Sequence, residues 1–194
     1  MCEITLTLAL SRSTGRGDNE RPFWSKNMTM PDAENAIQTM DFTREVRIDA
    51  PPEITFEAVL AEIGPESQMP DGKPFPLKLE PWPGGRWYRD LGEGAGHLWG
   101  HVQVIKPPTL LEVTGPMFMS YPAISHVQYR LTGDGDGTRL KITNRAFGYV
   151  PRGFMEGSEE GWNYGLKRIA EIAARLKGAR ATESLRTPLR GRRR

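Results

Sequence analysis

The chain has 194 residues, of which 38% are hydrophobic and 26% are charged, and this balance excludes disorder along its whole length. The formal net charge of +2 comes from a basic C-terminal end, so the body of the chain lacks the basic excess that favours nucleic acid. The single cysteine, Cys2, excludes an internal disulfide and a multi-cysteine zinc site, and no apolar run reaches the roughly 20 residues that span a bilayer.

The first forty residues mix Ser, Arg, Gly, Asn and Pro and show neither strand nor helix periodicity. We therefore expect residues 1–40 to be a flexible extension. The apolar stretch at 4–10 is short and lacks the basic start of a signal peptide, so we expect a cytoplasmic protein.

Regular structure is predicted from Met40 onward. Apolar and polar residues alternate over 42–48, which predicts a strand with one wet face. Pro52 can open the next helix, because a first-turn proline loses no intrahelical hydrogen bond. Apolar residues then recur at helical spacing until Gly64 and Pro65, so the sequence predicts a helix of about three turns.

A run of short alternating segments predicts antiparallel strands. They lie at 77–79, 86–90, 97–105, 110–114, 123–131 and 139–145. In the third of these, Leu98 is expected to share the apolar face with Val102 and Val104. The Gly-rich turn at 133–137 is expected to join the last two strands as a hairpin.

One long amphipathic helix closes the fold. Trp162, Leu166, Ile169, Ala173 and Leu176 recur at steps of three and four residues and define its apolar face. Ser158 can cap its start and Gly178 suits its end, so we expect a helix over 158–178. Residues 179–194 hold six Arg against one Glu and are expected to form a basic flexible tail.

Four short motifs carry a family resemblance: PGGRW at 83–87, GHVQVIKPP at 100–108, GTRL at 137–140 and EGW at 160–162. Together they resemble the SRPBCC superfamily, also called START-like or polyketide-cyclase-like. The resemblance covers residues 41–178 and is strongest to the branch named after the activator of the heat-shock-protein ATPase. It implies a helix-grip fold of the α+β class, in which a curved antiparallel sheet wraps around the C-terminal helix and leaves an apolar pocket between them.

The candidate ligand-binding residues follow from the inward-facing parity of the strands and from the helix and loops expected opposite them. They are Trp87, Met117, Met119, Ser125, Tyr129, Asn144, Phe154, Trp162, Leu166 and Ile169. The alternative for each is that it only fills the core. Tyr129 and Asn144 are the most informative, because a buried hydroxyl or amide needs a partner.

The sequence leaves three functions open. The first is binding of a small apolar or amphipathic molecule between the sheet and the C-terminal helix. The second is a cyclase, dehydratase or hydrolase that uses Tyr129, Asn144 or a histidine to polarise a carbonyl. The third is a protein-interaction module, whose partner the sequence does not identify.

Metal and cofactor sites are not predicted. His97 and His101 would lie about 13 Å apart on a strand, too far to share a metal ion. The glycines at 84–85 and 92–96 lack the strand-to-helix setting of a phosphate loop. Nucleic acid is not an expected partner either, because no aromatic residue interleaves the basic tail.

Overall fold

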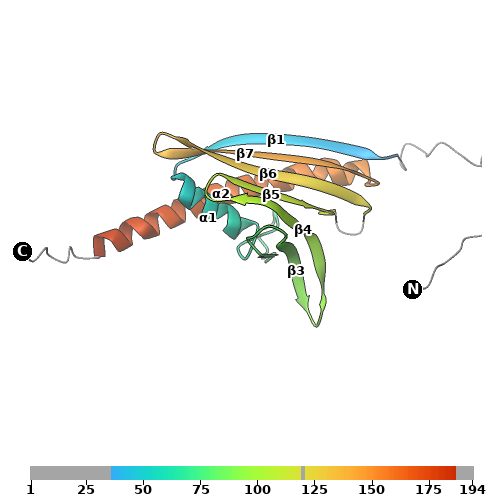
Figure 1. The fold of residues 1–194 in the computed structure, drawn as a ribbon, viewed down its shortest axis with the longest axis horizontal. Helices are drawn as coiled ribbons and strands as arrows, with labels where there is room; N and C mark the ends of the chain where they lie inside the picture. Colours follow the sequence, from blue (N-terminus) through green and yellow to red (C-terminus); the bar gives the residue numbers. More distant parts are fainter. Residues whose placement is uncertain (1–35, 119–120, 187–194) are drawn as a thin grey trace, which may run out of the picture. The chain divides into compact units, whose positions relative to one another are not determined.

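A computed structural model of the chain describes residues 36–118 and 121–186. Its elements are, in chain order, β1 (Gln38–Ile48), α1 (Pro52–Glu62), β2 (Lys78–Leu79), β3 (Arg86–Gly92), β4 (Ala95–Lys106), β5 (Leu110–Gly115), β6 (Ala123–Asp134), β7 (Gly137–Gly148) and α2 (Arg152–Arg186). Over these residues the fold is the predicted α+β helix grip (Figure 1). Neither of the two helices in the described residues is long and apolar enough to cross a membrane.

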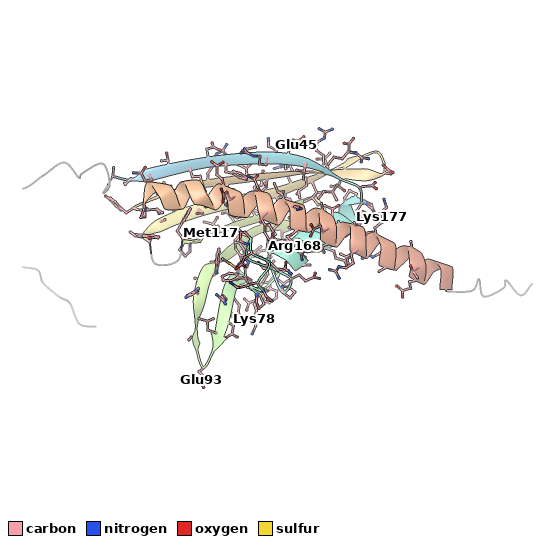
Figure 2. All side chains as sticks on the ribbon, turned by 180° about the vertical axis from the view of Figure 1, so that it is seen from behind. Glu45, Lys78, Glu93, Met117, Arg168 and Lys177 are labelled. Carbon is pink, nitrogen blue, oxygen red and sulfur yellow. The ribbon has the colours of Figure 1, made fainter. Side chains whose placement is uncertain are left out.

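The seven strands form one antiparallel sheet in the order β1-β7-β6-β5-β4-β3-β2. The first strand therefore pairs with the last one, and Phe42 lies opposite Asn144. Helix α2 runs across one face of this sheet, and the β3–β4 hairpin turns away from the direction of β1 and β7 (Figure 1). The hairpin tip at Glu93 projects away from α2 (Figure 2).

Alternation along the central strands separates a buried face from a wetter one. Val127 and Tyr129 of β6 and Leu140 and Ile142 of β7 are buried, whereas the residues between them are half-buried or exposed. The apolar face of α2 packs on this layer through its buried Leu166, Ile169, Ile172 and Ala173. Because full burial of such a side chain is worth about 1.5–3 kcal/mol, these contacts hold the helix against the sheet.

Two threonine hydroxyls fix the start of α1. Thr55 in its first turn and Thr138 at the start of β7 both donate to the Ala50 carbonyl, at 3.2 and 2.6 Å. Both threonines are fully buried, so water does not reach their hydroxyl groups and each hydroxyl depends on this hydrogen bond within the protein. Through the shared Ala50 carbonyl, the two hydrogen bonds hold the N-terminal end of α1 beside the start of β7.

Helix α2 is longer than the predicted span of 158–178, because it runs through Arg186. Gly178 does not end it. A glycine inside a helix costs only about 1 kcal/mol. On the next turn Arg180 forms an ion pair with Glu57 of α1, which supports the continued helix.

The ends of the chain fall partly outside the described residues. Residues 179–186, expected in the flexible tail, are helical, and 187–194 lie outside the described part. At the other end, β1 already includes residues 38–40, and 1–35 lie outside the described part.

The prediction for Leu98 was wrong, and a β-bulge is the reason. Trp87 pairs with Gly100 and Tyr88 pairs with Leu98, so Trp99 is an extra residue of β4 without a partner on β3. An extra residue reverses the alternation of side chains beyond it. Leu98 is consequently 43% exposed, whereas Trp99 packs against the core.

Candidate functional site

A cavity of about 490 Å³ lies between the sheet, the end of α1 and the first half of α2. Most of its wall is apolar: it includes Ile63, Leu77 and Phe118 besides the side chains described below. The loop between α1 and β2 contributes residues 67–70 and Phe75. The volume falls within the range of about 300–1,000 Å³ that is typical of sites for small molecules.

Seven of the ten candidate residues from the sequence line this cavity. They are Trp87, Met117, Tyr129, Asn144, Trp162, Leu166 and Ile169. Their role in binding a ligand remains a prediction. Met117 lies near the base of the β3–β4 hairpin (Figure 2), where its backbone N–H donates to the Trp99 carbonyl at 3.2 Å. Its backbone φ of 46° is in the left-handed region, which is uncommon outside glycine.

The three other candidates do not contribute to the described wall. Ser125 is buried on β6, two residues before Val127 and on the same face of the sheet. Its hydroxyl has no hydrogen-bond partner among the described residues, and it does not line the cavity. Met119 lies outside the described residues, as does the side chain of Phe154.

Aromatic rings form part of the cavity wall. Trp87 and Trp99 lie with ring centroids 5.5 Å apart, and Phe75 meets Trp99 edge-on at 5.9 Å. Trp87 is fixed by its Nε1, which donates to the Ile63 carbonyl at 2.6 Å. Trp162 of α2 adds a third indole to the lining. The sequence did not identify Trp99, because the bulge that turns its ring toward the core has no signature in the alternation pattern.

Two buried polar atoms of the lining, the Asn144 Oδ1 and the Trp99 Nε1, have no hydrogen-bond partner among the described residues. The Glu62 carboxyl and the Tyr129 hydroxyl line the same cavity. Tyr129 and Asn144 lie on neighbouring strands at diagonal positions of the same face, which places their Cα atoms about 7–8 Å apart. Tyr129 and Asn144 are only 2% and 1% exposed, so bulk water does not satisfy them.

Glu62 is the functional candidate that sequence reasoning missed. It follows Val59 by three residues and Thr55 by seven, so it continues the stripe of α1 that these buried residues define. An acidic residue at the end of a buried helical stripe was the available signal. Its carboxylate lies against Gly165 of α2, where a Cβ would come within 3.2 Å of Oε1. The absence of a side chain at Gly165 makes room for the acid.

Burial changes the acid–base behaviour of this pair of residues. Loss of water raises the pKa of Glu62 from 4.5 to about 7, although the positive charge of Arg168 acts in the opposite direction. Burial also raises the pKa of Tyr129 well above its usual value, and the nearby Glu62 charge adds to that rise. Tyr129 is therefore a neutral hydrogen-bond donor, whereas Glu62 exchanges a proton near neutral pH.

Two basic side chains lie near the cavity, of which Arg89 lines it and Arg168 does not. Arg168 lies on α2, the helix that packs on α1 (Figure 2). Its Nη1 donates to Glu171 at 2.8 Å, whereas its buried Nε has no partner among the described residues. Arg89 lies with its guanidinium 4.0 Å from the centre of the Phe75 ring. Among the described residues, no three His, Cys, Asp or Glu side chains gather as metal ligands.

A family model decides the classification of the chain. The model described as "Activator of Hsp90 ATPase homolog 1-like protein" matches residues 49–174, which is more than half of the chain. The chain belongs to this family. The resemblance to the SRPBCC superfamily, and to this branch of it, is thereby confirmed.

Solved structures share the fold of this AHSA1-like chain at low sequence identity. The Mll3558 protein from Rhizobium loti has a TM-score of 0.54 at 22% identity, over 71% of this chain and 99% of its own. The MLL2253 protein from Mesorhizobium loti has a TM-score of 0.52 at 23% identity, over 70% of this chain and 98% of its own. An uncharacterized protein from Rhizobium leguminosarum has a TM-score of 0.53 at 17% identity, over 72% and 97% of the two chains. No curated protein matches the AHSA1-like chain.

Proposed function

We propose that the AHSA1-like chain binds a small amphipathic molecule in the cavity between its sheet and α2. The observation that carries this proposal is the combination of about 490 Å³ of space with a mostly apolar wall and two buried polar atoms, the Asn144 Oδ1 and the Trp99 Nε1, that have no partner among the described residues. A wall that merely filled a core would leave neither the volume nor the unmet hydrogen-bonding capacity. Membership of the family supports it, because the superfamily is known for binding hydrophobic molecules.

The test uses a neutral fluorescent probe, Nile red, and a pair of matched variants. Gly161 lines the cavity and Gly178 does not, and an added Cβ meets nothing within 4 Å at either helical position. We expect Gly161→Phe to fill the cavity and reduce Nile red affinity at least tenfold, whereas Gly178→Phe leaves it unchanged. Equal binding by both variants would place the probe elsewhere and contradict the proposal.

Native mass spectrometry then identifies the natural ligand. The protein is purified from its own cell without detergent, and a co-purifying mass is sought. The same compound is expected to be lost from Gly161→Phe and retained by Gly178→Phe.

A second candidate is an enzyme that transforms the bound molecule. It is favoured by Glu62, because a carboxyl with a pKa of about 7 is suited to exchange protons at neutral pH beside the Tyr129 hydroxyl and the Asn144 amide. Incubation of the identified ligand with the native protein and with Glu62→Gln distinguishes the two functions. A change in ligand mass or ultraviolet spectrum with the native protein alone would establish turnover.

A further inference from the structure

We propose that the cavity selects hydrophobic amines, whose protonated nitrogen would lie against the Glu62 carboxylate and among the indole rings. This inference rests on the proposed function and names the class of ligand. It is built from four features of the cavity wall.

The first feature is the free acceptor capacity of Glu62. Its carboxylate lies against the bare backbone at Gly165, and no described residue donates a hydrogen bond to it. A carboxylate that is largely removed from water is stable only when a cation or several donors compensate it. An ammonium group supplies a positive charge and up to three donors at once.

The second feature is the polarity of the helix that carries Glu62. The carbonyl ends of a helix give its C-terminus a partial negative charge, and cations are favoured there. Helix α1 has no basic residue in its last turn, and it places an acid there instead. The fold thus concentrates negative potential at this part of the cavity wall.

The third feature is the aromatic surface around that position. Trp87 is fixed to the carbonyl of Ile63, the residue next to Glu62, and Trp99 and Trp162 line the same cavity. Indole faces attract cations more strongly than other aromatic rings do, and the attraction grows when water is removed.

The fourth feature is the balance of the remaining charges that face the cavity. Arg89 is the basic side chain of the lining, and its guanidinium lies over the Phe75 ring. Arg168 is outside the lining, and its Nη1 donates to Glu171. Glu160, which is exposed, adds a second carboxylate to the lining, and Tyr129 stays neutral. The lining therefore holds two carboxyl side chains against one guanidinium, which disfavours an anionic ligand.

The experiment compares 2-(1-naphthyl)ethylamine with 2-(1-naphthyl)ethanol and 1-naphthylacetate by calorimetry. The three probes share a ring system and differ in charge. We expect the amine to bind the native protein at pH 8 at least tenfold more tightly than the alcohol, and the acid to bind most weakly. In Glu62→Gln the amine and the alcohol should bind within about twofold of each other, whereas Glu53→Gln, an exposed change on the same helix, should keep the preference.

A pH series on the native protein tests the same point without a substitution. The pKa of Glu62 in the empty cavity is about 7, so the carboxyl must lose a proton before it can pair with an amine at lower pH. Between pH 8 and pH 5.5 the affinity for the amine should fall by about 30-fold, while that for the alcohol stays constant.

The possible failures are distinguishable. If the alcohol binds the native protein as tightly as the amine does, the preference for amines is overturned and the binding cavity stands. If the amine preference survives in Glu62→Gln or does not change with pH, the assignment to Glu62 is overturned. If none of the probes binds and Nile red is also excluded, both proposals fail together.

Discussion

Replacing Glu62 by glutamine should stabilise the empty protein at neutral pH. The folded chain holds the Glu62 proton up to a pKa of about 7, whereas the unfolded chain releases it near 4.5. Between these values the folded state binds more protons than the unfolded state does. The contribution of Glu62 to the free energy of unfolding is therefore fully present below pH 4.5 and is lost as the pH rises through 7. The Glu62 carboxyl is half-buried, and water screens part of the effect. The pKa shift then corresponds to a change of roughly 2–3 kcal/mol in the free energy of unfolding.

Glutamine has the same shape and does not ionise, so it escapes this loss. The difference in unfolding free energy between Glu62→Gln and the native protein should grow by roughly 2–3 kcal/mol from pH 4 to pH 8. Urea titrations followed by tryptophan fluorescence at five pH values measure this difference, and taking the difference cancels the contributions of other acids. The control is Glu53→Gln, whose difference should stay within about 1 kcal/mol. A difference that is flat with pH, or that favours the native protein at pH 8, would refute the reasoning.

Four other substitutions test two side chains of the cavity wall and two glycines of α2. Asn144→Leu removes a buried oxygen that has no partner, so its unfolding free energy should stay within about 1 kcal/mol of the native value or rise; a larger loss would reveal a partner for the amide. Trp87→Phe deletes the 2.6 Å hydrogen bond to the Ile63 carbonyl and should lower the free energy of unfolding by about 1–3 kcal/mol, as measured by urea titration. Gly178→Ala should raise the melting temperature, in keeping with a gain of about 1 kcal/mol. Gly165→Ala should gain less, because its Cβ would lie 3.2 Å from the Glu62 carboxylate.

The layers of the fold could be predicted from the sequence because apolar residues recur with a fixed spacing on the buried face of each strand and helix. Tyr129 and Ile142 alternate with wetter neighbours on β6 and β7, and Leu166 and Ile169 recur at helical spacing on α2. The same periods predicted which side chains of these elements face the core, and therefore the part of the cavity wall that β6, β7 and α2 supply. These features depend on one element at a time.

The features that the sequence did not reveal depend on contacts between elements. Trp99 reaches the cavity only through a bulge in the pairing of β3 with β4. Glu62 becomes a cavity residue because α2 offers the bare backbone of Gly165 opposite it. Ser158 was expected to cap α2, but the helix begins earlier and the Ser158 hydroxyl lies 3.3 Å from the Met40 sulfur. None of these contacts between elements produces a recurring spacing of residue types in the sequence.

The polar groups of the cavity link stability to binding with opposite signs. In the empty protein, Glu62 and Asn144 have lost water without gaining a hydrogen-bond partner from the described residues, so each of them lowers the stability of the fold. A ligand that donates to these groups would restore what burial removed, and its binding would add to the stability of the folded state by mass action. The same substitutions should therefore stabilise the empty chain and weaken its hold on the ligand. A core residue behaves differently: Leu140 is buried and does not line the cavity, so its truncation should lower the stability of the fold without any gain in the empty protein.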